Sequence, residues 1–193
     1  LMAEFVIISG VADALFKTAA TWVGRLPGGL GIATAFAGAG FGAISGSSTA
    51  SAATLAATSI PAMMKAGYEP KLACGVVAIS GTLAMLIPPS IALVLFGIIA
   101  DVSIGQLLIG GVLPGLLVTV AIALTVLFLV WQEPKRAPPG QAFTWGQKFR
   151  SLGSVWPMLV LFTAVTGIIY LGIATPTEAA GIGAFGAFMV ALL

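Results

Sequence analysis

The chain carries the run Ser45-Gly46-Ser47-Ser48-Thr49-Ala50-Ser51 in the middle of 39 residues, 26–64, that contain no charged side chain. Five of these seven residues are Ser or Thr, and small or apolar residues flank the run on both sides. An unpaired polar group in hydrocarbon costs several kcal/mol, so hydroxyls at that depth need protein, water or an ion around them. The run is therefore the strongest functional signal in the sequence.

The composition places the chain in a lipid bilayer. Of its 193 residues, 59% are hydrophobic and 7% are charged, whereas a soluble domain carries about 25% charged residues. Eight cations and six anions cannot supply the charged shell that a soluble core of this size needs. The net charge of +2 is spread over loops, so no nucleic-acid partner is predicted.

The residue types present exclude several chemistries. The chain has no His and one cysteine, Cys74, which excludes a zinc site, a Cys–His nucleophile and a disulfide within it. Cys74 stands among apolar residues and is expected to be a small, buried packing residue. The carboxylates of the apolar segments lie near segment ends and suggest no proton relay; they are Glu4, Asp13, Asp101 and Glu178. We therefore predict neither an enzyme nor a tightly bound cofactor.

Helix lengths predict how the uncharged stretch sits in the bilayer. As helices, 30–44 rises roughly 22 Å and 50–60 roughly 17 Å. Both are shorter than the hydrocarbon core of about 30 Å. Two half-depth helices that meet at the hydroxyl run fit better than one kinked span, so we predict a re-entrant helical hairpin over 28–64. Its many Gly and Ala residues permit close packing against neighbouring helices.

A second interrupted helix is predicted over 72–100. This segment is uncharged, but Gly81-Thr82 and then Pro88-Pro89-Ser90 interrupt it. Two adjacent prolines remove two backbone donors and push the preceding residue out of the helical region. Unwound backbone at this depth leaves carbonyls that can coordinate a cation. A proline kink without any ligand is the alternative reading.

The other segments are assigned by length and polarity. They are an apolar helix over 2–16, a polar connection over 17–25, a surface turn over 65–71, a spanning helix over 107–131, a water-exposed linker over 133–150, a spanning helix over 154–172 and a further helix from 179 onward. Thr175 or Thr177 is expected to cap the last helix, with Glu178 near its positive end. The fold class is thus all-α and polytopic.

The charges support one orientation. If the hairpin enters and leaves on one side, the loops 17–25, 65–71 and 133–150 share that side and hold all eight Lys and Arg residues. Asp101 and Glu178 then lie opposite. The positive-inside rule makes the cation-rich side cytoplasmic. Two full membrane passes in place of the hairpin would leave every loop on the same side of the membrane, so the charge pattern does not distinguish the two topologies.

A hairpin tip of this kind offers both oxygen ligands for a cation and N–H donors for an anion. It supplies hydroxyl oxygens, free carbonyls at the end of one half-helix, and free amides with a positive dipole at the start of the other. The oxygens suit a small hard cation and the amides suit a substrate carboxylate. The alternative is a run of small residues for close packing, with each hydroxyl bonded back to the carbonyl four residues earlier.

Motifs along essentially the whole chain occur in the order and spacing of one known family. They are 42–50 (GAISGSSTA), 61–68 (PAMMKAGY), Gly81-Thr82-Leu83, 87–91 (IPPSI), Ser103-Ile104, Pro114-Gly115-Leu116 and 175–180 (TPTEAA). With these motifs the chain resembles the large membrane subunit of TRAP (tripartite ATP-independent periplasmic) transporters, the DctM-like permeases.

The resemblance implies sodium-driven uptake of an organic acid, such as a C4-dicarboxylate, sialic acid or a related carboxylate, across the bacterial inner membrane. A periplasmic binding protein would deliver the substrate, and a small membrane subunit would scaffold the large one. The resemblance also implies an elevator-type fold of two inverted repeats. Residues 1–132 would form the first-repeat transport region, 133–150 a cytoplasmic linker and 151–193 the truncated start of the second repeat.

On this template the hairpin tip and the broken helix share one site. The implied ion- and substrate-binding residues are Ser45, Gly46, Ser47, Ser48, Thr49, Gly81, Thr82, Pro88, Pro89 and Ser90. Those implied to bind the sodium ion are Ser45, Ser47, Ser48, Gly81 and Thr82. The family's large subunit is about twice as long as this chain. We therefore expect a piece of a longer protein that holds one half of the site and does not transport alone.

Two other functions remain open at this stage. A sodium/dicarboxylate symporter of related architecture would work without a binding protein. An intramembrane enzyme would need a nucleophile beside a base, and the sequence offers no such pair.

Overall fold

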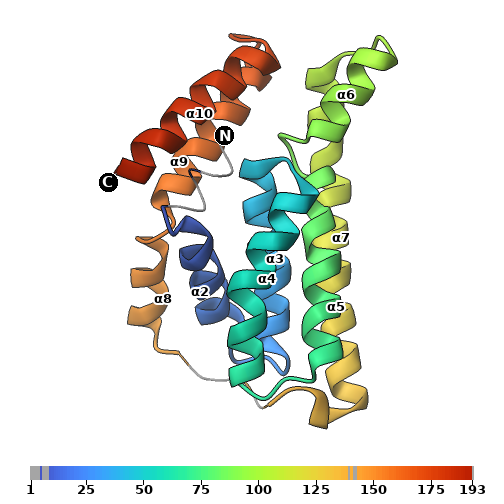
Figure 1. The fold of residues 1–193 in the computed structure, drawn as a ribbon, viewed down its shortest axis with the longest axis vertical. Coiled ribbons are helices and arrows are strands. Elements are labelled where there is room, and N and C mark those ends of the chain that lie inside the picture. Colours follow the sequence, from blue (N-terminus) through green and yellow to red (C-terminus); the bar gives the residue numbers. More distant parts are fainter. Residues whose placement is uncertain (1–4, 6–8, 139, 141–142, 193) are drawn as a thin grey trace.

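The structure is a computed structural model that describes residues 5, 9–138, 140 and 143–192, and every regular element within them is helical (Figure 1). In chain order these are α2 (Val11–Val23), α3 (Gly29–Ser45), α4 (Ser48–Lys65), α5 (Pro70–Gly81), the 3-10 helix η1 (Thr82–Met85), α6 (Ile91–Ile99), α7 (Ile104–Gln132), the 3-10 helix η2 (Pro134–Arg136), α8 (Trp145–Leu152), α9 (Trp156–Tyr170) and α10 (Pro176–Leu192). The expected all-α fold is confirmed over these residues.

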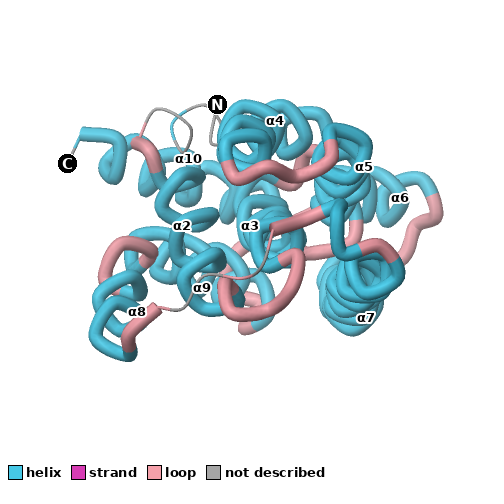
Figure 2. Tube along the Cα trace, turned by 90° about the horizontal axis from the view of Figure 1, so that it is seen from below, coloured by secondary structure: helices cyan, strands magenta, loops and turns pink. Residues whose placement is uncertain are grey.

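α3 and α4 form a helical hairpin whose tip is the dipeptide Gly46-Ser47. The two helices lie side by side (Figures 1 and 2). Gly46 ends α3 with a left-handed φ of 59°, and its N–H donates to the Gly42 carbonyl oxygen. Ser47 is extended and caps α4 by accepting from the Ala50 N–H. With 17 and 18 residues, the helices rise about 25 and 27 Å. Both are longer than the predicted half-depth helices, and α4 most of all, because it continues through Pro61 to Lys65.

α3 is the central helix of the bundle. It contacts α2, α4, α5, η1, α7 and α9, and Figure 2 shows it enclosed by its neighbours. Its Gly and Ala residues allow these helices to approach closely. Phe41, Ile32 and Ile44 fill the remaining space and are almost completely buried. The α3 end of the hairpin tip is therefore held from several sides.

The predicted break lies between α5 and α6. The α-helical geometry ends at Gly81, η1 follows, and 86–90 are irregular up to Ser90, which caps α6. The Ser90 hydroxyl donates to the Met85 carbonyl at 2.7 Å and accepts from the Leu93 N–H at 3.4 Å. The two prolines have no N–H to continue the helix, which explains the position of the break.

α7 returns along the full length of the bundle. Its 29 residues are mostly apolar and make it, by length and composition, the one single helix of the described residues that is able to span a membrane. α8 and α9, bent by 48° at their junction, count as a second candidate only when taken together. α9 has 15 residues and rises about 22 Å, so the expected span over 154–172 is shorter than predicted.

The expected polar connection over 17–25 was wrong. α2 continues through Lys17 to Val23 because its neighbours bury one face of this part of it. Thr18 is buried, and its hydroxyl donates to the Ser151 carbonyl oxygen of α8 at 3.0 Å. Most of the expected helix over 2–16 lies outside the described residues.

Other local expectations are refined by the structure. Helix α8 lies in the expected linker; its N-terminus has a capping box between Thr144 and Gln147. Thr175, not Thr177, caps α10: its hydroxyl accepts from the Glu178 N–H at 3.3 Å and donates to the Glu178 carboxylate at 2.8 Å. Cys74 is exposed on α5, so its expected burial was wrong.

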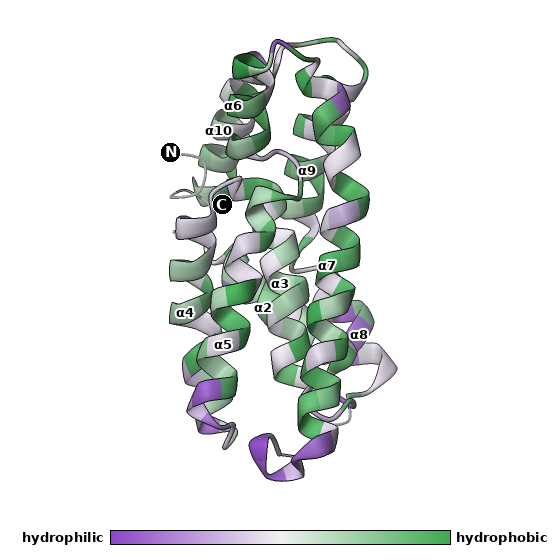
Figure 3. Cartoon of the chain, turned by 90° about the vertical axis from the view of Figure 1, so that its right-hand side faces the viewer, coloured by the Kyte–Doolittle hydropathy of each residue, from purple (hydrophilic) through white to green (hydrophobic). Residues whose placement is uncertain are grey.

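Hydrophilic residues gather at the two ends of the bundle (Figure 3). The α4–α5 loop and η2 lie together at one end, and the α6–α7 loop, with Asp101, lies at the other (Figures 1 and 3). Glu69 joins the first two through a backbone hydrogen bond from its N–H to the Arg136 carbonyl oxygen, 2.9 Å, and an ion pair to the Arg136 guanidinium, 3.5 Å. We call this the η2 end of the bundle.

Candidate functional site

The hairpin tip contacts the helix break directly. The Ile91 N–H, at the start of α6, donates to the Gly46 carbonyl oxygen at 3.3 Å. A Cβ atom on Gly46 would overlap the carbonyl oxygen of Pro89. Gly46 also has a left-handed φ, which costs side-chain-bearing residues energy. Both the conformation and the contact therefore require glycine at the tip.

Two further glycines bring the hairpin against the broken helix. A Cβ atom on Gly42 would lie 2.8 Å from the Ala84 Cα, and one on Gly81 would lie 2.7 Å from the Ala52 Cβ. Real Cβ atoms essentially never lie within 3.0 Å of another non-bonded atom, and neither neighbour is the end of a flexible side chain, so only glycine permits these contacts. The tip and the break form one packed unit, in which Gly46 and Pro89 of the predicted set lie against each other.

Four helix ends meet in this unit. α3 and η1 end there, with carbonyls that lack intrahelical donors, while α4 and α6 begin there, with amides that lack intrahelical acceptors. Helix C-terminal ends carry partial negative charge and N-terminal ends partial positive charge. Oxygen ligands for a cation and donors for an anion therefore lie in the same region.

The tip hydroxyls bond mainly to one another. Ser45 Oγ lies 2.9 Å from Ser51 Oγ, and Ser47 Oγ lies 3.1 Å from Thr49 Oγ1. Among the described residues the Ser48 hydroxyl makes no hydrogen bond. Thr49 is exposed at the tip. None of these four predicted residues donates its hydroxyl to the carbonyl four residues earlier, which was the packing alternative.

The hydroxyls of the break have backbone partners. Thr82 is exposed and donates to the Ile79 carbonyl at 2.7 Å. Ser90 is 1% exposed and serves as the cap of α6. Pro88 and Pro89 are joined by a cis peptide bond and supply carbonyls only. At the break, backbone carbonyls and not hydroxyls are therefore the available ligands.

Two polar residues beside the site were not among the predicted binding residues. Ser51 completes the pair with Ser45, and it stands at the end of the quoted run. Ser80 is fully buried next to Gly38, and its hydroxyl has no partner among the described residues. Its position just before Gly81, in a helix whose residues between Lys71 and Ser80 are all small or apolar, was the sequence signal for it.

Two interrupted helices that meet inside an apolar helical bundle are typical of membrane transport proteins. A family model described as "Tripartite ATP-independent periplasmic transporter, DctM component" matches residues 1–193. The chain belongs to this family, which confirms the resemblance drawn from its motifs.

Curated relatives agree with this assignment. The chain is 36% identical over 191 residues to the C4-dicarboxylate TRAP transporter large permease protein DctM of Vibrio cholerae, covering 99% of this chain and 42% of the relative. It is 38% identical over 192 residues to the protein of the same name from Pseudomonas aeruginosa, covering 100% and 44%. It is 34% identical over 181 residues to the ectoine TRAP transporter large permease protein TeaC of Halomonas elongata, covering 93% and 42%.

The chain spans less than half the length of these relatives. They are transport proteins and not enzymes, as the sequence predicted.

Proposed function

We propose that the chain forms part of the permease subunit of a sodium-coupled secondary transporter that takes up organic acids. The contact between the hairpin tip and the helix break carries this proposal, because it places oxygen ligands and free amides together. Sodium is a small hard cation that prefers oxygen ligands, and a carboxylate prefers a helix N-terminus.

The candidate sodium ligands are the hydroxyls of Ser45, Ser47 and Ser48 and backbone carbonyls near Gly81 and Thr82. The hydroxyls of Ser45 and Ser47 bond to other hydroxyls and accept from the Ser47 and Ala50 N–H groups, and none of these bonds occupies a helix carbonyl, so each hydroxyl can turn an oxygen toward an ion without leaving a helix carbonyl unpaired. Thr82 contributes through its carbonyl in this proposal, because its hydroxyl is engaged with Ile79.

The substrate carboxylate is proposed to lie at the starts of α4 and α6. The exposed Thr49 hydroxyl and the first-turn amides of α4 would donate hydrogen bonds to the carboxylate, since such amides have no intrahelical acceptor. The names of the relatives include C4-dicarboxylate and ectoine, so family membership by itself does not select the substrate. We propose a C4-dicarboxylate, sialic acid or a related carboxylate.

The membrane placement is part of the proposal. The α3–α4 hairpin is re-entrant and the η2 end faces the cytoplasm of a bacterial inner membrane. The hairpin and the broken helix belong to the first of two inverted repeats, which moves as an elevator. A periplasmic binding protein and a small membrane subunit complete the three-part assembly that the family name denotes.

The test is uptake of labelled succinate by the full-length permease with its small subunit and binding protein in proteoliposomes. We expect uptake under an inward sodium gradient and none under a matched potassium gradient. Ser47→Ala is expected to raise the sodium concentration needed for half-maximal uptake without loss of membrane insertion. Equal rates in the two gradients would refute sodium coupling.

Two further measurements separate the alternatives. Uptake that persists without the binding protein would favour the symporter that works alone. Residues 1–193 reconstituted by themselves are expected to accumulate no substrate, and sodium-driven accumulation by them would show that this half of the site is sufficient.

A further inference from the structure

Helix α8 lies at the edge of the bundle, where α2 packs against one side of it (Figures 1 and 2). The Thr18 hydroxyl of α2 donates to the Ser151 carbonyl at 3.0 Å, and the Lys148 ammonium donates to the Trp22 carbonyl at 3.4 Å. None of the eight residues of α8 is buried. One side of α8 is therefore held by α2, and the rest of its surface is open.

The open surface carries an apolar stripe. Trp145, Phe149 and Leu152 stand at positions i, i+4 and i+7, which lie on one face of an α-helix. The Trp145 and Phe149 rings are 6.4 Å apart, and each residue is 65% exposed. The capping box between Thr144 and Gln147 stabilises the start of the helix. α8 therefore presents an aromatic face to its surroundings.

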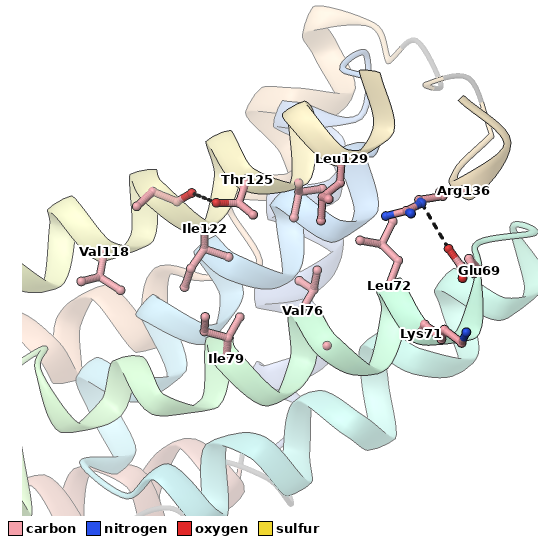
Figure 4. A pocket seen from close by; sticks show the side chains of 13 residues that line it. Glu69, Lys71, Leu72, Val76, Ile79, Val118, Ile122, Thr125, Leu129 and Arg136 are labelled. Atoms are coloured by element: carbon pink, nitrogen blue, oxygen red, sulfur yellow. Dashed lines mark hydrogen bonds and ion pairs between the residues drawn. The ribbon is translucent and has the colours of Figure 1, made fainter. Parts of the chain in front are cut away.

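The charges of α8 are cationic and unpaired. Lys148 and Arg150 have no ion pair among the described residues, and 137–177 contains no Asp or Glu. The cation of η2 differs, because carboxylates neutralise Arg136, and one of them is Glu69 (Figure 4). The positive charge of α8 is therefore free to attract an anionic partner.

α2 extends this cationic surface. Lys17 precedes Thr18, which contacts α8, and Arg25 follows two residues after α2 ends; both cations are exposed and have no ion pair among the described residues. The carboxylate of α2 is Asp13, one turn before Lys17. Cations therefore outnumber carboxylates on the surface that α2 and α8 share.

The position of α8 along the chain is that of a membrane boundary. α9 begins at Trp156, four residues after α8 ends, and its 15 residues are mostly apolar. The two helices, bent by 48° at their junction, are long and apolar enough together to count as a membrane span. The eight residues of α8 rise about 12 Å, so the whole helix lies close to the end of the apolar segment.

An aromatic face beside unpaired cations matches one kind of partner. An apolar protein helix would cover the stripe but would leave the cations without counter-charges. The surface of an anionic lipid leaflet satisfies both, because its phosphates attract Lys and Arg and Trp and Phe rings settle at the boundary between headgroups and acyl chains.

We propose that α8 binds the surface of an anionic phospholipid leaflet. Trp145 and Phe149 insert at the boundary between headgroups and acyl chains, and Lys148 and Arg150 pair with headgroup phosphates. The inference rests on the membrane placement in the proposed function, and it is independent of sodium coupling and of the substrate.

The test places the environment-sensitive fluorophore NBD on α8 of the full-length permease with its small subunit, in a background without other accessible Cys, including Cys74→Ala. Phe149→Cys puts the label on the stripe. Gly146→Cys is the matched control, because Gly146 is an exposed residue of the same helix, lies outside the stripe and has open space at its Cβ. The labelled proteins are measured in phosphatidylcholine nanodiscs that contain a rising fraction of phosphatidylglycerol.

Two reagents report the surroundings of the label: a lipid-borne nitroxide quenches it from the bilayer, and dithionite reduces it from water. As the phosphatidylglycerol fraction rises, the label at 149 is expected to become quenched by the nitroxide and protected from dithionite, while the label at 146 stays reducible. Arg150→Gln is expected to raise the phosphatidylglycerol fraction for half-maximal quenching about five-fold, the effect of one cation at an anionic surface.

Lys65→Gln is the control for charge, because Lys65 is an exposed cation at the end of α4 and outside the α2–α8 surface. It is expected to leave the half-maximal fraction unchanged. Uptake in proteoliposomes serves as the separate readout of the transport proposal.

Three results would overturn the proposal. One is reduction by dithionite at 149 as fast as at 146 at every lipid composition, which would show that the stripe lies in water. Another is equal nitroxide quenching at 149 with and without phosphatidylglycerol, unaffected by Arg150→Gln. A third is protection of the label at 149 from both reagents, which would show that a protein segment covers the stripe.

Discussion

Replacing Gly46 by Ala is expected to separate the hairpin tip from the helix break. A residue with a side chain loses about 1–2 kcal/mol in the left-handed conformation that Gly46 adopts at φ 59°. The new Cβ also meets the Pro89 carbonyl oxygen, which is backbone and cannot rotate away. Overpacking of this kind costs about 1–3 kcal/mol, so the sum is about 2–5 kcal/mol.

Three other glycines separate the two contributions. Gly67 has φ 88° and open space at its Cβ, so Gly67→Ala is expected to lose only the conformational part, about 1–2 kcal/mol. Gly42 is helical but lies against Ala84, so Gly42→Ala is expected to lose only the packing part, about 1–3 kcal/mol. Gly75→Ala meets neither cost and is expected to stabilise its helix by about 0.5–1 kcal/mol.

The assay is unfolding of the full-length permease by SDS in mixed micelles, with the free energy of unfolding compared across the four variants. Sodium-driven uptake is measured in parallel. Gly46→Ala and Gly42→Ala are expected to reduce uptake more than Gly67→Ala does, because they alone disturb the site. If Gly46→Ala destabilised the protein no more than Gly67→Ala, the contact between the tip and the Pro89 carbonyl would be refuted.

Three further outcomes are expected. A double-mutant cycle of Ser45→Ala and Ser51→Ala in the unfolding assay should give a coupling energy of about 0.5–1.5 kcal/mol, and additive losses would contradict their hydrogen bond. Ser48→Ala should leave the unfolding free energy within about 0.5 kcal/mol of wild type while weakening sodium activation of uptake; unchanged activation would count against Ser48 as a ligand. Tyr68→Phe should destabilise by about 1 kcal/mol, because the buried Tyr68 hydroxyl accepts from the Leu30 N–H at 3.1 Å. Burial raises the pKa of Tyr68 above its ordinary value of 10.0, so the wild type should lose stability as the pH rises above that value, because a charged phenolate is costly to bury; Tyr68→Phe should flatten that loss.

The sequence predicted the two helix interruptions because their causes are local. Pro88 and Pro89 lack the N–H groups that a helix needs, and Gly46 is free to adopt a left-handed conformation. Helix length against bilayer thickness then predicted a turn at the hydroxyl run. None of these inferences required knowledge of a distant contact.

Expectations failed where a residue's surroundings come from distant segments. Lys17 and Thr18 read as a polar connection, but contact with α8, more than a hundred residues later, keeps Thr18 inside a helix. Cys74 has apolar neighbours along the chain, yet it lies on the exposed side of α5. Polarity along the chain does not specify which face of a helix a neighbour covers.

The candidate site shows the same division. The composition, the run at 45–51 and the pair Pro88-Pro89 predicted a bilayer environment, two helix breaks and hydroxyls at the first of them, because solvation cost and backbone conformation are properties of each segment. Only the tertiary structure decided that the Gly46 carbonyl bonds the Ile91 N–H, that Ser51 pairs with Ser45, and that α8 packs against α2. These features depend on which faces pack together, and packing is set by the shapes of all the neighbouring helices at once.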